Sequence, residues 1–396
     1  MNQKVEREQA AVTSIVESLD VPQSAYERAI ARYEAIAKHL ERDGSALATA
    51  GPHIYAQGSF QIGTVVPPID SSQGYDLDLT CELKELDKLG QTQRQLKELL
   101  GQEVRSYASK HGMKRPIEKP RCWHLDYRDD VSFHMDVVPA VPEDPQRKNE
   151  IAANLDPSVA HLANLAVGIT DTRAEDYDTI STDWSMSNPM GYAEWFKGRM
   201  RGAATHILLE AKAVLREADE IPVYKWKTPL QIVVQILKRH RNVMFAGDTS
   251  GDAPISCIIT TLAARAYEGQ LNVRDALIGI VENMPKFIRS SSPRVANPVN
   301  GGEDFAEKWE THPGKEQAFL RWYRQLRRDL NGLSEIANVS DLREYLKQRF
   351  DINLREDRAR ELMPTAGVAA TAAATTASTP RVKIEARPDP WRTSEG

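Results

Sequence analysis

Asp76 and Asp78 are separated by one residue in the stretch YDLDLTCEL, residues 75–83. Alternation of polar and apolar residues is typical of a β-strand, in which side chains two positions apart project from the same face. Two carboxylates about 7 Å apart on one face can bind a pair of divalent cations, which would hold the attacking and leaving oxygens of a phosphoryl transfer. Because an isolated D-x-D pair is more often structural, the interpretation needs further signals.

A third carboxylate is usually required to hold the metal ion that activates the nucleophile. Asp136 is the best candidate, because it lies in the apolar stretch 131–138, where an unpaired charge would be costly. Asp126, Asp129 and Asp130 lie near a predicted turn and are explained as solvated or hydrogen-bonding turn residues. We therefore predict Asp136 as the third acid.

A glycine-serine pair precedes the D-x-D motif by sixteen residues, in the string AQGSFQIGT. Gly58 and Ser59 provide a permissive backbone, free N–H groups and a hydroxyl, which suit close approach to a triphosphate. A plain turn before a strand would explain this pair if it stood alone. In combination with Asp76, Asp78 and Asp136, the pattern predicts nucleotidyl transfer.

The elements that would position these residues follow from the hydrophobic pattern. The first 45 or so residues are predicted to be helical, with Pro22 in a first turn and Ser24 and Glu27 forming a capping box. A strand over 75–83, a helix over about 91–110, and strands over 121–127 and 131–138 joined by a turn at 128–130 indicate an α/β or α+β core with a mixed sheet.

Helical periodicity dominates from residue 192 to about 362, most clearly in 228–245, where Leu230, Val233, Val234 and Leu237 form an apolar stripe. We predict an N-terminal helical segment over 1–48, a core domain over 49–220, a helical lobe over 221–362 and a flexible tail over 363–396. The tail is rich in Ala, Thr and Pro and has too little large apolar surface to offset the entropy of ordering.

Length and composition restrict the class of protein. The 396 residues have a net charge of −5, three cysteines and no apolar run of the 18–20 residues that a membrane helix needs. The N-terminus lacks the build of a signal peptide. These features predict a cytoplasmic enzyme without membrane association, and the acidic balance argues against a protein that coats long nucleic acid.

The motifs resemble those of the polymerase-β-type nucleotidyltransferase superfamily. The strings QGSFQIGTVVPP, YDLDLT, FHMDVVPAV, SNPMGYAEWF and TPLQIVVQILKRHRN are similar to its bacterial branch of cGAS/DncV-like nucleotidyltransferases, the CD-NTases or oligonucleotide cyclases of anti-phage (CBASS) signalling. The gap between Gly-Ser and D-x-D is longer than in many relatives, which we attribute to an insertion over 66–74. The resemblance implies a polymerase-β-like mixed sheet with an N-terminal helix and a C-terminal, OAS-like helical lobe.

The resemblance also implies an activity, in which two or three nucleoside triphosphates are joined stepwise into a cyclic oligonucleotide with release of pyrophosphate. Asp76 and Asp78 would bind two Mg²⁺ ions, for which Mn²⁺ can substitute, and Asp136 would share the metal site and orient the attacking hydroxyl. Gln57, Gly58 and Ser59 would contact the donor phosphates. Lys238 matches the phosphate-binding lysine of the family and Ser256 a triphosphate-holding hydroxyl.

Several features have a simpler interpretation. The run KRHR, residues 238–241, could be a solvated basic face, and we assign Arg239 and Arg241 to the surface. Cys122 and His124 have no further Cys or His at zinc-like spacing, so the zinc-bearing DNA-binding insertion of the animal relative is expected to be absent, and no duplex DNA requirement is expected.

Two other functions remain open from the sequence. The same chemistry serves a transferase that makes linear oligonucleotides or attaches a nucleotide to RNA or protein, and a catalytically inactive nucleotide-binding scaffold would share the fold. The resemblance also implies regulatory protein partners and, in some systems, conjugation through the C-terminus, for which the terminal Gly396 would be suitable. An ordinary frayed terminus is the favoured explanation of this glycine, since many chains end in small residues.

Overall fold

The computed structural model describes residues 3–70, 73–127, 132–214 and 227–363. The predicted domain boundary near residue 220, the turn at 128–130 and the tail from residue 364, with Gly396, lie outside the described residues. The division into four domains therefore stays a prediction.

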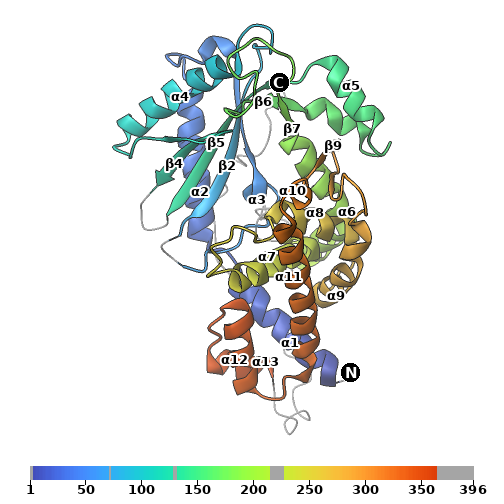
Figure 1. The fold of residues 1–396 in the computed structure, drawn as a ribbon. Helices are drawn as coiled ribbons and strands as arrows, with labels where there is room; N and C mark the ends of the chain where they lie inside the picture. The colour runs from blue at the N-terminus through green and yellow to red at the C-terminus, as the bar shows by residue number, and fades with distance from the viewer. Residues whose placement is uncertain (1–2, 71–72, 128–131, 215–226, 364–396) are drawn as a thin grey trace.

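A mixed sheet forms one half of the molecule (Figure 1). Its main path runs in the order β1 (Pro52–Gln57), β2 (Tyr75–Leu83), β5 (Phe133–Pro142), β4 (Trp123–Tyr127) and β3 (Ile117–Glu118), and β6 (Val167–Ile169) and β7 (Ser185–Ser187) extend it from β5. β2 and β5 are parallel, whereas the other pairs are antiparallel. The predicted mixed sheet is confirmed, and so are the predicted strand over 75–83 and the pairing of the two strands that follow the helix.

One face of this sheet is apolar and packs on two helices. Alternation places Leu77, Leu79, Met135, Val137 and Leu125 in one hydrophobic core, where each is at most 5% exposed. The helices α2 (Gln23–Glu41) and α4 (Gln93–Lys110) cover this face. The opposite face carries the polar residues of the same strands and is therefore available for chemistry.

The N-terminal segment consists of two helices rather than one. α1 (Gln3–Ser18) packs in the helical half of the molecule, whereas α2 packs on the sheet, and the chain turns between them at residues 19–22 (Figure 1). The predicted capping box is wrong: Pro22 is the N-cap residue, no side chain caps the helix, and Glu27 instead accepts a hydrogen bond from the Gln23 side chain.

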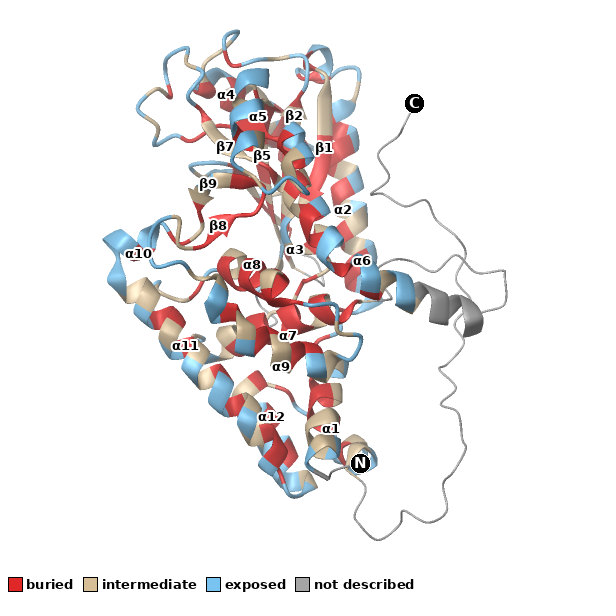
Figure 2. Ribbon diagram, turned by 90° about the vertical axis from the view of Figure 1, so that its right-hand side faces the viewer, coloured by how far each residue is buried: buried red, intermediate tan, exposed pale blue. Residues whose placement is uncertain are grey.

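A second hydrophobic core lies within the helical half, shown in red at the centre of that half in Figure 2. The helix α7 (Pro229–Met244) lies at its centre, and the stripe Leu230, Val233, Val234 and Leu237 is fully buried, as the periodicity predicts. Thr228 and Gln231 form a capping box at the start of α7. Around it lie α6 (Pro189–Val214), α8 (Ser256–Ala266), α9 (Val273–Asn283), α11 (Pro313–Gly332), α12 (Val339–Phe350) and α13 (Glu356–Leu362).

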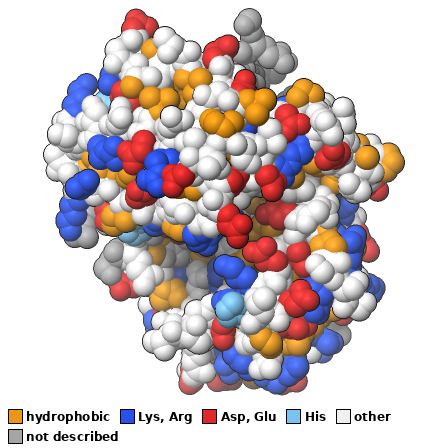
Figure 3. Space-filling model, turned by 45° about the horizontal axis from the view of Figure 1, so that its top comes forward, with side chains coloured by type: hydrophobic (Ala, Val, Ile, Leu, Met, Phe, Trp, Pro, Cys, Tyr) orange, Lys and Arg blue, Asp and Glu red, His pale blue; other side chains and the backbone are white. Residues whose placement is uncertain are grey.

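The remaining elements are short. They are α3 (Gly58–Gln61), α5 (Pro145–Ala153), α10 (Lys308–Thr311), β8 (Ala296–Asn297) and β9 (Asn300–Asp304). Acidic and basic side chains are intermixed over the face in Figure 3, in keeping with the small net charge. Within the described part of the chain, none of the helices has the length and apolar character required to cross a membrane.

Candidate active site

The register of four strands places one row of polar side chains across the open face of the sheet. Gln57 of β1 lies opposite Asp78 of β2, Asp78 opposite Asp136 of β5, and Asp136 opposite His124 of β4. Asp78 and Asp136 are thus neighbours on parallel strands although 58 residues separate them in sequence. The structure therefore brings the predicted third acid to the D-x-D motif.

A second row lies one step along the strands. Asp76 is opposite His134, and His134 is opposite Asp126. Asp126 Oδ1 lies 2.8 Å from His134 Nδ1 and 3.0 Å from His124 Nε2, both within hydrogen-bond distance, and the Asp126 side chain is 21% exposed. Asp126 forms hydrogen bonds, as one of the two predicted explanations has it, but it is not a turn residue, because the hairpin pairing extends beyond it and places it on the polar face of β4.

The charge of Asp78 is unfavourable in the absence of a cation. Burial and, to a smaller extent, the neighbouring carboxylates of Asp76 and Asp136 raise the pKa of Asp78 to about 7, while Lys238 and Lys119 act in the opposite direction. Three carboxylates on adjacent strands provide oxygen ligands, which Mg²⁺ prefers. The site thus fits divalent cations, because a bound cation would relieve this repulsion.

We expect Mg²⁺ binding to depend on pH because of this raised pKa. Below pH 7 a proton on Asp78 competes with the metal, so the affinity should increase by up to about tenfold per pH unit on approaching pH 7 and level off above it. The stability of the metal-free protein should change with pH in the opposite direction. The pKa of Asp78 is 3.8 in the unfolded chain and about 7 in the folded protein, so the folded protein binds this proton more tightly, and the resulting stabilisation is lost as the pH rises through 7. Calorimetric titrations between pH 5.5 and 8.5 would test the affinity, and a pH-independent affinity would contradict the prediction.

Asp136 is paired rather than isolated. Lys119 Nζ donates to both of its carboxylate oxygens at 3.1 Å, and His124 Nδ1 lies 2.5 Å from Oδ1. The apolar neighbours of Asp136 in sequence, such as Met135, face the other side of the sheet and do not surround the carboxylate. Lys119 carries no sequence signal of its own, since its position depends on how β3 pairs with β4.

Gly58 lies against the D-x-D motif. Its φ is +67°, and a Cβ atom at this position would lie 2.4 Å from Asp78 Oδ2. Gln57 Oε1 accepts a hydrogen bond from the Thr80 hydroxyl at 2.9 Å, and the Ser59 carbonyl accepts one from the Thr64 amide at 2.9 Å. The absence of a side chain at Gly58 thus allows the Gly-Ser backbone to approach the carboxylates.

The polar side of α7 holds the segment that follows α3. Four of its side chains donate hydrogen bonds to backbone carbonyls within residues 62–67. The donors are Gln231, Gln235, Lys238 and Arg239, and the acceptors are Ile62, Val65, Thr64 and Pro67, respectively. The assignment of Arg239 to the surface is wrong, since it is 6% exposed, and the run at 238–241 is not a solvated face.

Two basic residues of α7 lie near the site: Lys238 is close to the carboxylates, and Arg241 is close to the start of α8. Lys238 is 8% exposed; burial and the charge of Arg241 lower its pKa to about 8, while Asp78 and Asp76 act in the opposite direction. Arg241 donates to Ser256 Oγ at 2.8 Å and to the Pro254 carbonyl. Arg241 is half-buried and these two hydrogen bonds hold its guanidinium, so it is not a freely solvated surface residue as the sequence predicts, and burial lowers its pKa to about 10.

Comparisons with known proteins agree with this geometry. Residues 52–139, which include both carboxylate rows, match the family model described as cyclic GMP-AMP synthase DncV-like, nucleotidyltransferase domain. The chain is 28% identical to a c-di-GMP synthase of Roseivirga ehrenbergii over 86% of this chain and 83% of that protein. It is 23% identical to the cyclic dinucleotide synthase CdnG of Bradyrhizobium diazoefficiens over 86% of this chain and 80% of that protein.

The fold is also similar to that of a solved structure of one of these relatives. The solved structure of the Bradyrhizobium diazoefficiens CdnG in complex with GTP aligns with a TM-score of 0.62 and 21% identity, over 90% of this chain and 98% of that chain. The sheet and its carboxylates define a nucleotidyltransferase. Within that class, residues 52–139 match the DncV-like nucleotidyltransferase domain, and the chain is similar to cyclic dinucleotide synthases over most of its length.

Proposed function

We propose that this enzyme joins nucleoside triphosphates into a cyclic dinucleotide and releases pyrophosphate. The observation that carries the proposal is the register that places Asp136 opposite Asp78, with Asp76 on the same strand. The two relatives, a c-di-GMP synthase and a cyclic dinucleotide synthase, favour a cyclic product. A role in anti-phage signalling in the cytoplasm, with regulatory protein partners, is part of the same proposal.

In each of the two bond-forming steps, a ribose hydroxyl oxygen would attack the α-phosphorus of a triphosphate, and the bond to pyrophosphate would break. Asp76 and Asp78 would hold two Mg²⁺ ions, and Asp136 would share the ion next to the attacking hydroxyl. Bound Mg²⁺ would supply stabilisation of the charge on the attacking and leaving oxygens. Asp136, held by Lys119 and His124, would orient the hydroxyl and help to remove its proton.

The triphosphate would lie between the Gly-Ser segment and α7. Gly58 and Ser59 would offer backbone N–H groups and a hydroxyl, and Gln57 would fix the start of this segment through its bond to Thr80. Lys238 and Ser256 would contribute from the helical half, as the resemblance implies. We add Arg241 to this proposed set, because its guanidinium donates a hydrogen bond to Ser256 Oγ.

Arg241 provides a test of the phosphate site. It has no carboxylate partner among the ion pairs of the described residues, and its buried Nε has no hydrogen-bond partner there. We expect Arg241→Met to raise the KM for nucleoside triphosphates at least about tenfold while leaving the melting temperature equal or higher, because a half-buried charge without a carboxylate partner stabilises the free protein little. Steady-state kinetics and thermal melting would measure the two effects.

The control for this variant is Arg274→Met. Arg274 forms an ion pair with Glu8 that joins α9 to α1. Its loss should lower the melting temperature without raising KM. If Arg241→Met destabilised the protein and left KM unchanged, the assignment of Arg241 to the phosphate site would be wrong.

The proposed activity is tested by incubating the purified chain with Mg²⁺ and labelled nucleoside triphosphates, singly and in pairs, and identifying products by mass spectrometry. We expect a product that lacks terminal phosphates and resists phosphatase. Linear products with a 5′-triphosphate would favour the alternative transferase function. Binding of nucleotides without any turnover would favour an inactive scaffold. The addition of EDTA should stop all product formation.

A further inference from the structure

Three metal-ligating side chains meet beside Asp136, on the β4–β5 hairpin. His124 and Asp126 lie on β4, and His134 lies on β5 directly opposite Asp126. One ligand atom from each lies within 4.8 Å of the other two. Asp126 Oδ1 is 3.0 Å from His124 Nε2 and 2.8 Å from His134 Nδ1, and the two imidazole rings stack with centroids 5.5 Å apart.

His124 lies between two carboxylates, an arrangement that requires either a second proton on its ring or a metal ion at one of its nitrogens. Nδ1 lies 2.5 Å from Asp136 Oδ1 and Nε2 lies 3.0 Å from Asp126 Oδ1, so the ring lies between two carboxylates. A neutral imidazole has only one N–H group, so it can donate to only one of them. A metal ion bound at Nε2 would leave Nδ1–H to donate to Asp136, which is the usual arrangement of a metal-ligating histidine with a carboxylate on its second nitrogen.

The donor set and its spacing both suit a transition metal. Two imidazoles and one carboxylate are the ligands of many zinc sites with an open position, whereas Mg²⁺ prefers oxygen ligands alone. Bonds of about 2.0–2.1 Å at angles of about 90–109° place ligand atoms about 2.9–3.4 Å apart. The observed separations of 2.8 and 3.0 Å are close to this range, so little movement is needed.

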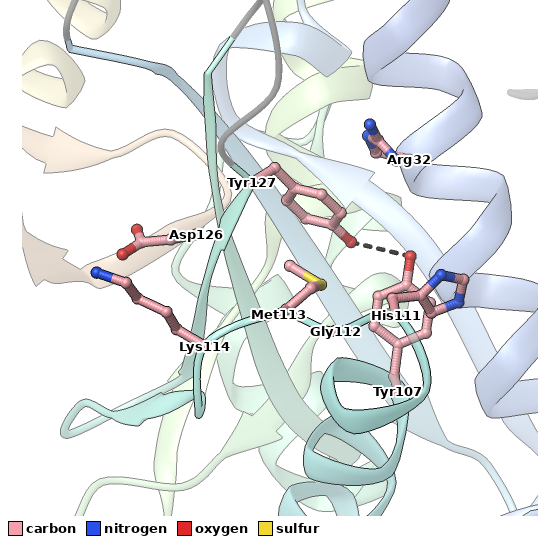
Figure 4. Close-up of a pocket in the computed structure, with 8 residues that line it drawn as sticks. All are labelled: Arg32, Tyr107, His111, Gly112, Met113, Lys114, Asp126 and Tyr127. Carbon is pink, nitrogen blue, oxygen red and sulfur yellow. Dashed lines mark hydrogen bonds between the residues drawn. The ribbon is translucent and has the colours of Figure 1, made fainter.

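We propose that His124, Asp126 and His134 bind a divalent transition metal ion of the Zn²⁺ type, distinct from the Mg²⁺ ions assigned to Asp76, Asp78 and Asp136. The side chains are 13%, 21% and 40% exposed, respectively, so an ion can enter from solvent at the His134 side. Figure 4 shows Asp126 and Tyr127 on opposite sides of β4, with Tyr127 directed toward Tyr107, so Asp126 is free to point to the hairpin face.

The bound ion would act as a positioning device for Asp136. It would fix the ring of His124 and its tautomer, and the Nδ1–H group would then hold one oxygen of the Asp136 carboxylate. His124, Asp126 and His134 are thus positioning residues. Lys114, which extends toward Asp126 in Figure 4, adds positive charge near the ligands and should weaken the site.

The experiment separates this site from the catalytic one. The full chain carrying Asp76→Asn and Asp78→Asn is stripped with EDTA and titrated with Zn²⁺ by calorimetry and with Co²⁺ by visible absorption. We expect one equivalent of Zn²⁺ to bind and Co²⁺ to give ligand-field bands. Adding His134→Ala should weaken Zn²⁺ binding at least about tenfold and abolish the bands. Adding His161→Ala, which removes an exposed histidine, should change neither.

Three outcomes would overturn the proposal: absence of Zn²⁺ binding in the double variant, equal affinity with and without His134, and equal loss in the His161 control. Because His134→Ala could disturb the hairpin, His134→Cys is tested as well, since a thiolate can replace the imidazole and should restore Zn²⁺ binding. The readout is metal binding in a background without the carboxylates of Asp76 and Asp78. If Zn²⁺ does not bind, the proposed nucleotidyl transfer is therefore unaffected. If the protein proves to have no nucleotidyl transfer activity, the Zn²⁺ titration is still a valid test of this site.

Discussion

Replacing Asp76 and Asp78 together by asparagine is expected to lower nucleotide incorporation by at least about 10³-fold. Both side chains project from the open face of β2, and amides bind Mg²⁺ far more weakly than carboxylates do. Loss of several kcal/mol of transition-state stabilisation corresponds to a rate decrease of this size. The rate of pyrophosphate release from labelled triphosphates would measure the effect.

The fold should survive this double substitution. The pKa of Asp78 is raised, which means that its charge is unfavourable in the metal-free protein, so removal of the two charges should leave the melting temperature equal or higher. The control is Glu34→Gln, which changes an exposed acid on α2 and should affect neither property. Turnover by the folded double variant at the rate of the unaltered enzyme would refute the metal site.

Gly58→Ala is the second substitution with a large expected effect. The new Cβ atom would lie 2.4 Å from Asp78 Oδ2, so either the Gly-Ser backbone or the carboxylate must move. A misplacement of about 1 Å in a catalytic group can reduce the rate about 10²-fold, and we expect a loss of at least this size in kcat/KM. Product formation under subsaturating triphosphate would measure it.

The chain contains a matched control for this change. Gly112 has nearly the same φ as Gly58, +63° against +67°, but a Cβ atom there would meet nothing within 4 Å. Alanine at either position should destabilise the fold by about 1–2 kcal/mol through backbone strain alone. Only Gly58→Ala should lose activity. Equal activities in the two variants would show that contact with Asp78 has no importance for the reaction.

The sequence predicts the three carboxylates of the site well, because β-strand periodicity is a local property. The strict alternation in residues 75–83 determines which side chains share a face, and the apolar stretch after residue 131 predicts the partner strand. Parallel pairing of β2 with β5 then brings Asp136 to Asp78. Nothing further is needed to place these three carboxylates together, although their roles remain proposals.

The positions of the basic residues of the site could not be predicted in the same way. Arg239 and Arg241 appear solvated in a run of charges, but burial of a cation depends on which segment covers it, and here residues 62–67 cover Arg239 from about 170 positions away in sequence. Lys119 and His134 likewise acquire their partners through strand register. The Ser24–Glu27 pair shows the reverse error: a capping pattern is local, yet the helix begins at Gln23, two residues too early for Ser24 to be its N-cap.

The four hydrogen bonds from α7 to residues 62–67 have a mechanical consequence. Each such bond contributes about 0.5–1.5 kcal/mol, so pulling α7 away from this segment would require about 2–6 kcal/mol in addition to the exposure of buried side chains. Thermal fluctuations rarely supply that amount, so the helix and the segment that follows the Gly-Ser pair should move as a single rigid body. If the two halves of the molecule open for substrate entry or product exit, they must therefore rotate about this contact. The largest displacement between the halves would then occur at the residues farthest from it.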